Sequence, residues 1–428
     1  MSARSPRRLM PVLVVGLALV LVVAIAAVIS RPETATGEPV GNSVPVALTA
    51  QGLPRDTSIG VILSLGSAQG SEWKDAAQGA AVAAHRLAAG GSPVILETRD
   101  DRGTSQGARD AVAELAAQKV AGIVLATSGE HVPAALQAAQ EAGIPVLLPY
   151  YSGELSGFDT AYSLTPGPQP VSAAMKSALG EAGHVMLIDL GGPAPEGINP
   201  AERRAPAAGD DLNTLAVEVS KLAAPQRGEP VDAVLITGPA TRQAAMVHAL
   251  QQRNISLPLV LGPAATSPGF ESALHEAGGS ASSRLLSVGT GAVDAAALRP
   301  GDEGRAMSGF LAAVRVMAED PQVMNLTGDQ PFAKVAPVAE AHSHDAVIAL
   351  VHAAAHAKSG EPGAVAGQLD KLSLQAGHGI AGGDLDLGRD ADQAQAVVLH
   401  LASQDLGLRP APSGARIPAR WFAGPAGN

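Results

Sequence analysis

Apolar runs alternate with alanine-rich amphipathic stretches along most of this 428-residue chain, and this alternation constrains its fold more than any other feature. From residue 58 onward, "SIGVILSL", "PVILETRDD", "AGIVLAT" and "IPVLLPY" read as strands, and stretches with helical spacing separate them. Strands buried on both faces and separated by helices of about ten to fifteen residues form βαβ units with a parallel sheet. The pattern therefore predicts an α/β fold.

The same alternation appears twice. Helices are expected over 73–89, 105–118 and 131–142 in the first half, and over 169–182, 212–224 and 241–253 in the second. The second set alternates with the strands "HVMLIDL", "DAVLITG" and "LPLVLG". A mainly helical block over 300–358 follows, and "GDLDLGR" and "AQAVVLHLA" read as strands that complete one or both sheets. The sequence thus predicts two Rossmann-like lobes.

The amino terminus carries arginines before a long apolar stretch. Arg4, Arg7 and Arg8 precede the uncharged segment Leu9–Ser30, which is long enough to cross ~30 Å of hydrocarbon as a helix. Because arginines stay cytoplasmic, we expect an N-terminal signal anchor over 1–30, a single-pass transmembrane helix with the rest of the chain extracytoplasmic. The alternative is a secreted protein released by signal cleavage near Ala24-Ile25-Ala26.

Residues 31–55 are rich in Pro, Gly and Thr and predict a flexible linker. The chain carries a net charge of −11, and no basic stripe with interleaved aromatic residues is present, so we expect no nucleic-acid partner. It has no cysteine, which excludes disulfides, thiolate metal ligands and cysteine nucleophiles.

No catalytic motif emerges from the sequence. Asp100 and Asp101 are adjacent on a strand and point to opposite faces, so turn capping is their expected role. His342, His344 and Asp345, with His352 and His356 at i, i+4 spacing, permit a metal hypothesis, but the spacing leaves the remaining ligands undefined. We expect neither an enzyme, a cofactor nor a metal site.

Aromatic residues make up only 2% of the chain, yet all three tyrosines lie in "IPVLLPYYSGELSGFDTAYSL", residues 144–164. Tyr150 and Tyr151 follow a predicted strand directly. Ligand crevices of open α/β sheets lie at the carboxyl ends of the strands, so both residues are candidates for a binding site. The alternative is that their rings only pack against the core of the lobe.

In the order of the chain, a first lobe is followed by a second lobe and then by a return to the first. This order resembles the type I periplasmic binding proteins, in particular the branch that binds branched-chain amino acids for ABC importers. The resemblance covers about residues 57–400 and is carried by "IGVILSL", a helix ending in Gly90-Gly91, "VILETRDDRG", and "HSHDAVIALVHAAAHA". It implies two lobes with parallel sheets joined by a multi-strand hinge. The lobe boundaries we expect are 56–165 with 291–375 for lobe 1 and 166–290 with 376–420 for lobe 2.

The resemblance also implies where a ligand would bind. In that family hydroxyls and backbone amides of two first-lobe loops meet a ligand carboxylate. These loops correspond here to Ser128-Gly129 and to Ser152, with Tyr150 and Tyr151 replacing small residues. Trp73 falls where the family often places an aromatic ring over the ligand. We expect Tyr151, Ser152 and the Ser128-Gly129 amides, faced by Trp73, to form the first-lobe wall of an interlobe cleft.

The second lobe departs from the family pattern. The acid that meets a ligand ammonium aligns with Ala264, so a standard α-amino acid would be buried with its ammonium unpaired. Residues 191–211 have no amphipathic period and are expected to loop out. Arg203, Arg204 and Arg242 are either contacts for an acidic ligand or solvated surface charges.

Two functions follow as expectations. One is an extracytoplasmic, membrane-anchored solute-binding protein that closes two lobes on a small polar solute, amino-acid-like or amide-like, and delivers it to ABC permease subunits. The other is a ligand-free or sensory envelope ectodomain of the same fold that acts through protein–protein contacts. Its cleft would be filled by Trp73, Tyr150 and Tyr151.

Overall fold

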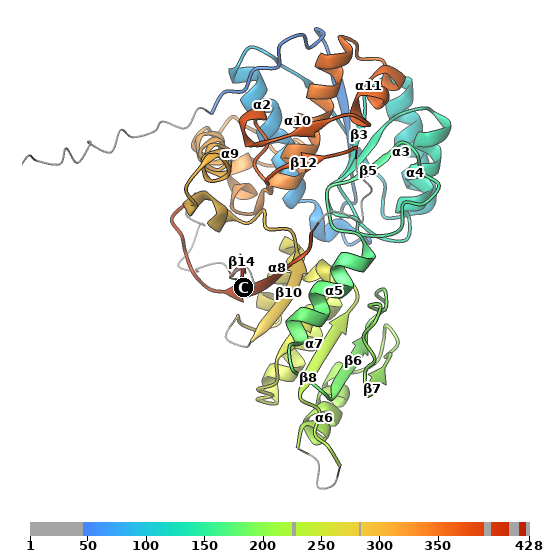
Figure 1. Ribbon diagram of the computed structural model, residues 1–428, viewed down its shortest axis with the longest axis vertical. Coiled ribbons are helices and arrows are strands. Elements are labelled where there is room, and N and C mark those ends of the chain that lie inside the picture. The colour runs from blue at the N-terminus through green and yellow to red at the C-terminus, as the bar shows by residue number, and fades with distance from the viewer. Residues whose placement is uncertain (1–45, 225–227, 282–283, 389–394, 411–418, 425–428) are drawn as a thin grey trace, which may run out of the picture. The chain divides into compact units, whose positions relative to one another are not determined.

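The computed structural model describes residues 46–224, 228–281, 284–388, 395–410 and 419–424 (Figure 1). The predicted transmembrane segment and most of the predicted linker lie outside these ranges. No helix within the described ranges is both long enough and apolar enough to span a membrane.

The first lobe is built on a five-stranded sheet with the order β2-β1-β3-β4-β5, and every neighbouring pair in it is parallel. Its strands are β1 (Ser58–Leu63), β2 (Ile95–Asp100), β3 (Ile123–Leu125), β4 (Val146–Leu148) and β5 (Ala161–Ser163). The central strands β1, β3 and β4 consist almost entirely of buried aliphatic residues. This is why the sequence shows continuous apolar runs there rather than strict alternation.

Helices cover both faces of this sheet. On one face α3 (Ser105–Ala117) and α4 (Val132–Glu141) pack on Ile62, Ile123 and Val146, and Figure 1 shows the two helices side by side. On the other face α2 (Gly79–Ala89), α10 (Ala341–Ala357) and α11 (Pro362–Leu369) pack on Val61, Val124 and Leu147. Successive residues of a strand thus pack into cores on opposite faces of the sheet. A further core forms around α9 (Asp302–Glu319).

The second lobe contains a seven-stranded sheet with the order β14-β13-β10-β9-β8-β6-β7. Its strands are β6 (Val185–Asp189), β7 (Glu202–Arg204), β8 (Ala233–Thr237), β9 (Leu259–Leu261), β10 (Leu285–Gly289), β13 (Val397–Ala402) and β14 (Arg420–Ala423). The sheet is parallel except at β13, which runs antiparallel to both β10 and β14. The helices are α5 (Pro168–Leu179), α6 (Leu212–Ala223), α7 (Ala240–Gln252) and α8 (Pro268–Glu276).

Short elements complete the chain. The 3-10 helices are η1 (Ser71–Trp73), η2 (Ala76–Gln78), η3 (Pro263–Thr266), η4 (Asp294–Leu298), η5 (Phe332–Lys334), η6 (Ala336–Val338) and η7 (Ala376–His378). The strands β11 (Ser373–Leu374) and β12 (Leu385–Asp386) pair only with each other.

The structure corrects several sequence-based expectations. The helix expected over 73–89 begins at Gly79, because two 3-10 turns precede it. The loop expected over 191–211 contains β7, which extends the second sheet beside β6. "GDLDLGR" does not complete a large sheet but forms β12 in the small hairpin. Ile380 and Leu387 belong to the first-lobe core, so the chain returns to the second sheet after residue 388, later than the expected residue 376.

A series of buried polar contacts connects residues 381–382, in the segment that leads back to the second sheet, to helices α2 and α10 of the first lobe. The Arg86 guanidinium of α2, 3% exposed, lies 2.9 Å from His344 Nε2 and donates to the Val46 carbonyl at 2.9 Å. The other ring nitrogen of His344 lies 2.7 Å from the Asp345 carboxylate. That carboxylate also accepts the backbone N–H groups of Ala381 and Gly382. Burial lowers the pKa of Arg86 to about 10, and the Asp345 charge opposes this shift.

His344 should make the stability of the fold depend on pH. Burial lowers the pKa of His344, the bond to Asp345 opposes this shift, and Arg86 adds to it. The unfolded chain keeps a histidine pKa of about 6.5. Below that pH the unfolded state binds a proton that the folded state does not, so the free energy of unfolding should fall as pH falls. Urea unfolding at about pH 7.5 and about pH 5.5 measures this loss, which should be larger in the wild type than in His344→Gln. Equal losses in the two proteins would contradict the assignment.

Candidate functional site

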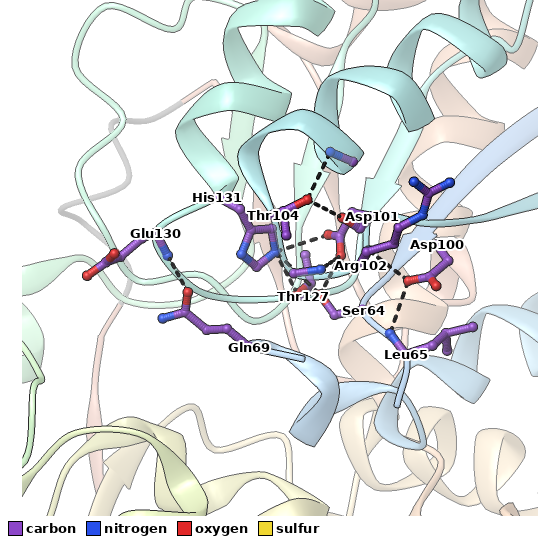
Figure 2. Close-up of polar contacts among 12 residues, drawn as sticks. Ser64, Leu65, Gln69, Asp100, Asp101, Arg102, Thr104, Thr127, Glu130 and His131 are labelled. Atoms are coloured by element: carbon purple, nitrogen blue, oxygen red, sulfur yellow. Dashed lines mark hydrogen bonds and ion pairs between the residues drawn. The ribbon is translucent and has the colours of Figure 1, made fainter. Parts of the chain in front are cut away.

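Four buried polar side chains join the carboxyl ends of three strands in the first lobe (Figure 2). Ser64 follows β1, Asp101 follows β2, and Thr127 and His131 lie between β3 and α4. Ser64 Oγ donates to Asp101 Oδ1 at 2.6 Å and lies 2.7 Å from Thr127 Oγ1. The other carboxylate oxygen of Asp101 lies 3.0 Å from His131 Nε2. All four side chains are essentially inaccessible to solvent, so they hold the three loops in one arrangement.

Asp101 also shapes its own loop. Its Oδ1 accepts the Gly103 N–H at 2.8 Å, while the neighbouring Asp100 accepts the N–H groups of Leu65 and Arg102. These contacts agree with the expected turn-capping role of the acid pair. Nothing in the sequence, however, indicates a contact between Asp101 and His131, because the two residues lie on different strand–helix connections.

This cluster contains serine, histidine and aspartate but does not have the geometry of a catalytic triad. The Ser64 hydroxyl and the Asp101 carboxylate both approach the same ring nitrogen, His131 Nε2, at 3.3 Å and 3.0 Å. A triad needs the carboxylate and the nucleophile on opposite nitrogens of the imidazole. Nδ1 of His131 is buried and makes no hydrogen bond with any described residue. The cluster is therefore a structural one.

The Ser128-Gly129 loop is covered by another loop of the same lobe. Gln69 Oε1 accepts the Glu130 N–H at 3.2 Å, and Figure 2 shows its side chain reaching from the β1 loop to that amide. A Cβ atom placed on Gly129 would lie 2.6 Å from Gln69 Cδ, and the φ of this glycine is +138°. A Cβ on Gly70 would lie 1.9 Å from Thr127 Oγ1. Both glycines are thus required by the close approach of the two loops.

Trp73 stacks on Tyr150, not on Tyr151. The Trp73 and Tyr150 ring centroids are 4.5 Å apart with an interplanar angle of 7°, and the two residues are 6% and 5% exposed. Burial and the nearby Glu340 carboxylate raise the pKa of Tyr150 well above its ordinary value. Trp73 Nε1 makes no hydrogen bond with any described residue. Both rings belong to the core of the first lobe, as in the packing interpretation of the tyrosines.

Tyr151 and Ser152 lie apart from this stacked pair. The Tyr151 ring packs against the α3–α4 core, and a Cβ on Gly153 would lie 2.3 Å from it, so the ring covers its own loop. Its carbonyl accepts hydrogen bonds from Thr165 and Ser163. Ser152 is half-buried. The expected arrangement, in which Trp73 faces Tyr151, is thus not seen, because the Trp73 ring stacks on Tyr150 and the Tyr151 ring packs in another core.

The second lobe contacts the first through helix α8. A Cβ on Gly269, in the first turn of this helix, would lie 2.5 Å from Glu72 Cβ, so the helix packs directly on η1. Ala264 lies in η3, packs on the second-lobe core, and accepts a hydrogen bond from Ser267 Oγ through its carbonyl at 2.7 Å. As expected from its sequence, this position offers no carboxylate.

The three arginines considered for an acidic ligand all have partners in the protein. Arg203 pairs with Asp189 at 2.8 Å, and Arg204 pairs with Glu202 and Glu218. Arg242 donates to three backbone carbonyls, including that of Leu190 at 2.9 Å. These contacts organise the β7 segment, and they explain why a stretch without amphipathic period still adds a strand to the sheet.

One cavity lies beside the crossovers between the lobes. Its volume is about 750 Å³, within the range of small-molecule sites. Its lining includes Glu154, Asp159, Tyr162, His342, Asp384 and Asp386, and among the described residues that line it there is no lysine or arginine. None of the seven candidate residues, Trp73, Ser128, Gly129, Tyr150, Tyr151, Ser152 and Ala264, lines it.

The histidines do not assemble a metal site within the described part of the chain. His342 lies 2.5 Å from Thr290 Oγ1, while His344 belongs to the buried polar contacts with Arg86. His352 contacts His356 and His378 through their ring edges, and one of its ring nitrogens lies 2.8 Å from the His378 carbonyl. No group of three or more histidine and acidic residues among the described residues is arranged to hold a metal ion.

Sequence reasoning missed Gln69, Gly70, Glu72 and Gly269. The first three lie in "GSAQGSEW", a loop between β1 and the first helix whose two glycines signal a tight path. That signal shows a turn but does not show which loop it meets. Gly269 follows a proline at the start of α8, and nothing local distinguishes it from a residue of an ordinary helix start.

The periplasmic binding protein family matches residues 56–398 of this chain. No curated protein matches it by sequence. Solved structures that match include the branched-chain amino acid transporter substrate binding protein LivJ from Streptococcus pneumoniae, in complex with isoleucine. It is 17% identical, with a TM-score of 0.61 over 86% of this chain and 100% of that one. The leucine binding protein LivK from Thermotoga maritima is 20% identical, with a TM-score of 0.58 over 80% and 95%.

A third match is an ABC transporter substrate-binding protein from Desulfitobacterium hafniense in complex with Leu. It is 16% identical, with a TM-score of 0.58 over 83% of this chain and 99% of that one. At such identities these structures establish the fold, and they confirm the expected two-lobed arrangement of parallel sheets.

Removing the Asp101 carboxylate should destabilise the first lobe. Asp101→Ala removes the carboxylate that contacts Ser64 and His131 and leaves Ser64 only its contact with Thr127, so we expect a loss of about 1–3 kcal/mol. Asp100→Ala is the matched control, because Asp100 is exposed and caps the same turn. Urea unfolding of both variants should show the larger loss in Asp101→Ala. Losses of equal size would mean that the buried cluster does not hold the loops.

Proposed function

Because the chain belongs to the periplasmic binding protein family, we propose that it is an extracytoplasmic solute-binding protein, held at the cell membrane by its N-terminal segment, that serves an ABC importer. Proteins of this family bind solutes and are not enzymes, in agreement with the expectation from the sequence. The solute is small and polar, and the protein delivers it to ABC permease subunits.

The observation that carries this proposal is the pair of parallel sheets joined by three crossovers, with a cavity of about 750 Å³ beside them. The crossovers lie between β5 and α5, between β10 and η4, and between β12 and β13. Lobes joined in this way can rotate about the crossovers and close on a ligand. The described lining of this cavity carries several carboxylates and one histidine but no lysine or arginine, and such a lining suits a solute that brings hydrogen-bond donors.

The chemistry of the expected cleft argues against a standard α-amino acid. Ala264 provides no carboxylate for an ammonium, and the arginines considered for an acidic ligand, Arg203, Arg204 and Arg242, already bond to groups of the protein. An ammonium buried without a partner would cost several kcal/mol. The solute is therefore amide-like, or amino-acid-like with one of its charged groups absent or left in solvent.

A specific observation favours the second candidate function, an ectodomain that acts through protein contacts. Arg409, on the segment that follows β13, forms two hydrogen bonds with Asp294 at 2.6 and 2.7 Å and donates to the carbonyls of Ala336 and Ala339. Arg315 of α9 donates to the Leu408 carbonyl. These bonds tie a strand of the second sheet to helices packed with the first lobe, so they oppose rotation about the crossovers.

A solute screen combined with a distance measurement separates the two functions. The full-length chain in mild detergent is heated with amino acids, amides, short peptides or polyols, and a solute at 100 times its Kd should add about 2.7 kcal/mol of apparent stability. Since the chain has no cysteine, Ala117→Cys on α3 and Lys221→Cys on α6 place one spin label on each lobe. A stabilising solute should shift the distance between the labels. Absence of any stabilising solute, or stabilisation at an unchanged distance, would favour the ectodomain function.

The topology has its own test. The arginines before Leu9–Ser30 support a topology with the lobes outside the cytoplasmic membrane, and in that topology protease added to intact protoplasts should degrade them. A cytoplasmic protein serves as the control for intact cells. Protection of the lobes would contradict the topology, and release of a soluble form shortened near Ala26 would replace the anchor with a cleaved signal peptide.

A further inference from the structure

A second cavity lies between strands β13 and β14 of the second sheet and the helices α9 and α10, and its volume is about 130 Å³. Its walls are mainly apolar and come from both sides. Met307 and Phe310 belong to α9, and Leu399 and Phe422 belong to β13 and β14. Since a water molecule takes about 30 Å³ in the liquid, the cavity has room for a group of a few non-hydrogen atoms. None of the seven candidate residues from the sequence lines it.

One charged side chain of this cavity has no partner. Among the described residues that line it, the carboxylates and guanidinium groups are those of Glu271, Asp294, Glu340, Arg409 and Arg420. Asp294 and Arg409 form two hydrogen bonds with each other. Glu271 accepts a backbone N–H at 3.3 Å, and Glu340 lies 3.6 Å from His342 Nδ1. The Arg420 guanidinium, in contrast, makes neither a hydrogen bond nor an ion pair with any described residue.

The strand that carries Arg420 holds it at the cavity. Arg420 is the first residue of β14, which pairs with β13, and the next residue, Trp421, donates its ring N–H to a backbone carbonyl of η3 at 3.1 Å. Burial lowers the pKa of Arg420 to about 10, the Arg409 charge adds to this shift, and the Asp294 carboxylate opposes it. The guanidinium therefore keeps its charge at neutral pH although it is half-buried.

An anion would supply the missing partner. A cation that is withdrawn from water and left unpaired is costly, and a bound anion removes this cost. Guanidinium groups bind carboxylates through two parallel hydrogen bonds, and the apolar walls of the cavity suit a short hydrocarbon chain behind the carboxylate.

We propose that Arg420 anchors a carboxylate-binding site in this cavity and that its ligand is a short-chain monocarboxylate. The site goes beyond the proposed function, because a free short-chain acid can bind there whether or not the lobes also take up a solute.

Propionate and propionamide are a matched pair of probes, because they share one carbon skeleton and differ in charge. In an NMR titration of the full-length chain in mild detergent, with chloride as the only other anion, the wild type should bind propionate saturably. Propionamide with the wild type, and propionate with Arg420→Gln, should bind at least about tenfold more weakly, since each combination lacks one charge of the ion pair. Arg253→Gln, which removes an exposed charge from the second lobe, should match the wild type.

Urea unfolding provides a readout that needs no ligand. In buffer without carboxylates, Arg420→Gln should unfold at the same urea concentration as the wild type or at a higher one, because the variant loses an unpaired charge. Arg409→Gln should unfold at a lower concentration, because Asp294 loses its partner. Added propionate should raise the midpoint of the wild type but not that of Arg420→Gln.

Three binding results would overturn the site: a wild type that binds no propionate, equal binding of propionate and propionamide, or an Arg420→Gln variant that binds propionate as tightly as the wild type. A lower urea midpoint for Arg420→Gln in buffer without carboxylates would also overturn it, because Arg420 would then have a partner within the protein. Failure of the proposed function is seen separately, in the solute screen and in the distance between the labels on the two lobes.

Discussion

The buried contact between Asp101 and His131 is the interaction on which the candidate site depends. It joins the end of β2 to the start of α4, and Ser64 and Thr127 connect both to the ends of β1 and β3. A parallel sheet brings these strand ends to one edge but leaves the loops beyond them undefined. With the four side chains fixed to one another, the β1 loop lies so close to the β3 loop that only glycine fits at position 70, while the φ of +138° favours glycine at position 129.

The architecture was predictable because local sequence patterns indicate it. Apolar runs such as "SIGVILSL" and "DAVLITG" are buried on both faces, so they identify the central strands, and the two sets of βαβ units follow. Edge strands, and the strands formed where the chain returns to a sheet, were harder to predict. β7 consists of Glu202, Arg203 and Arg204, and it forms because ion pairs with Asp189 and Glu218 satisfy its charges, a tertiary effect with no periodic signature.

The candidate site was predictable only as a set of loops. Sequence placed Ser128, Gly129 and Tyr151 at strand ends, where the structure also has them, but could not show which side chains meet. Whether Trp73 turns to Tyr150 or to Tyr151 depends on where the two 3-10 turns before α2 direct its ring. Gln69 lies 61 residues from Glu130 in the chain, so only the close approach of the two loops reveals their bond.

Contacts that fill a cleft and contacts that join two lobes have opposite consequences for a binding protein. Gln69 over Gly129 is one exposed side chain, held by one hydrogen bond to a backbone amide, and a short movement of the side chain breaks that bond. Arg409 is a largely buried cation with four hydrogen bonds, two of them to a carboxylate, and separating it from Asp294 would leave both charges poorly solvated. If the lobes move, the rotation must therefore either keep the Arg409 contacts as its pivot or break them, and the first path costs less. The opening side of the molecule is then the one where Gly269 meets Glu72, next to the loop that carries Gln69.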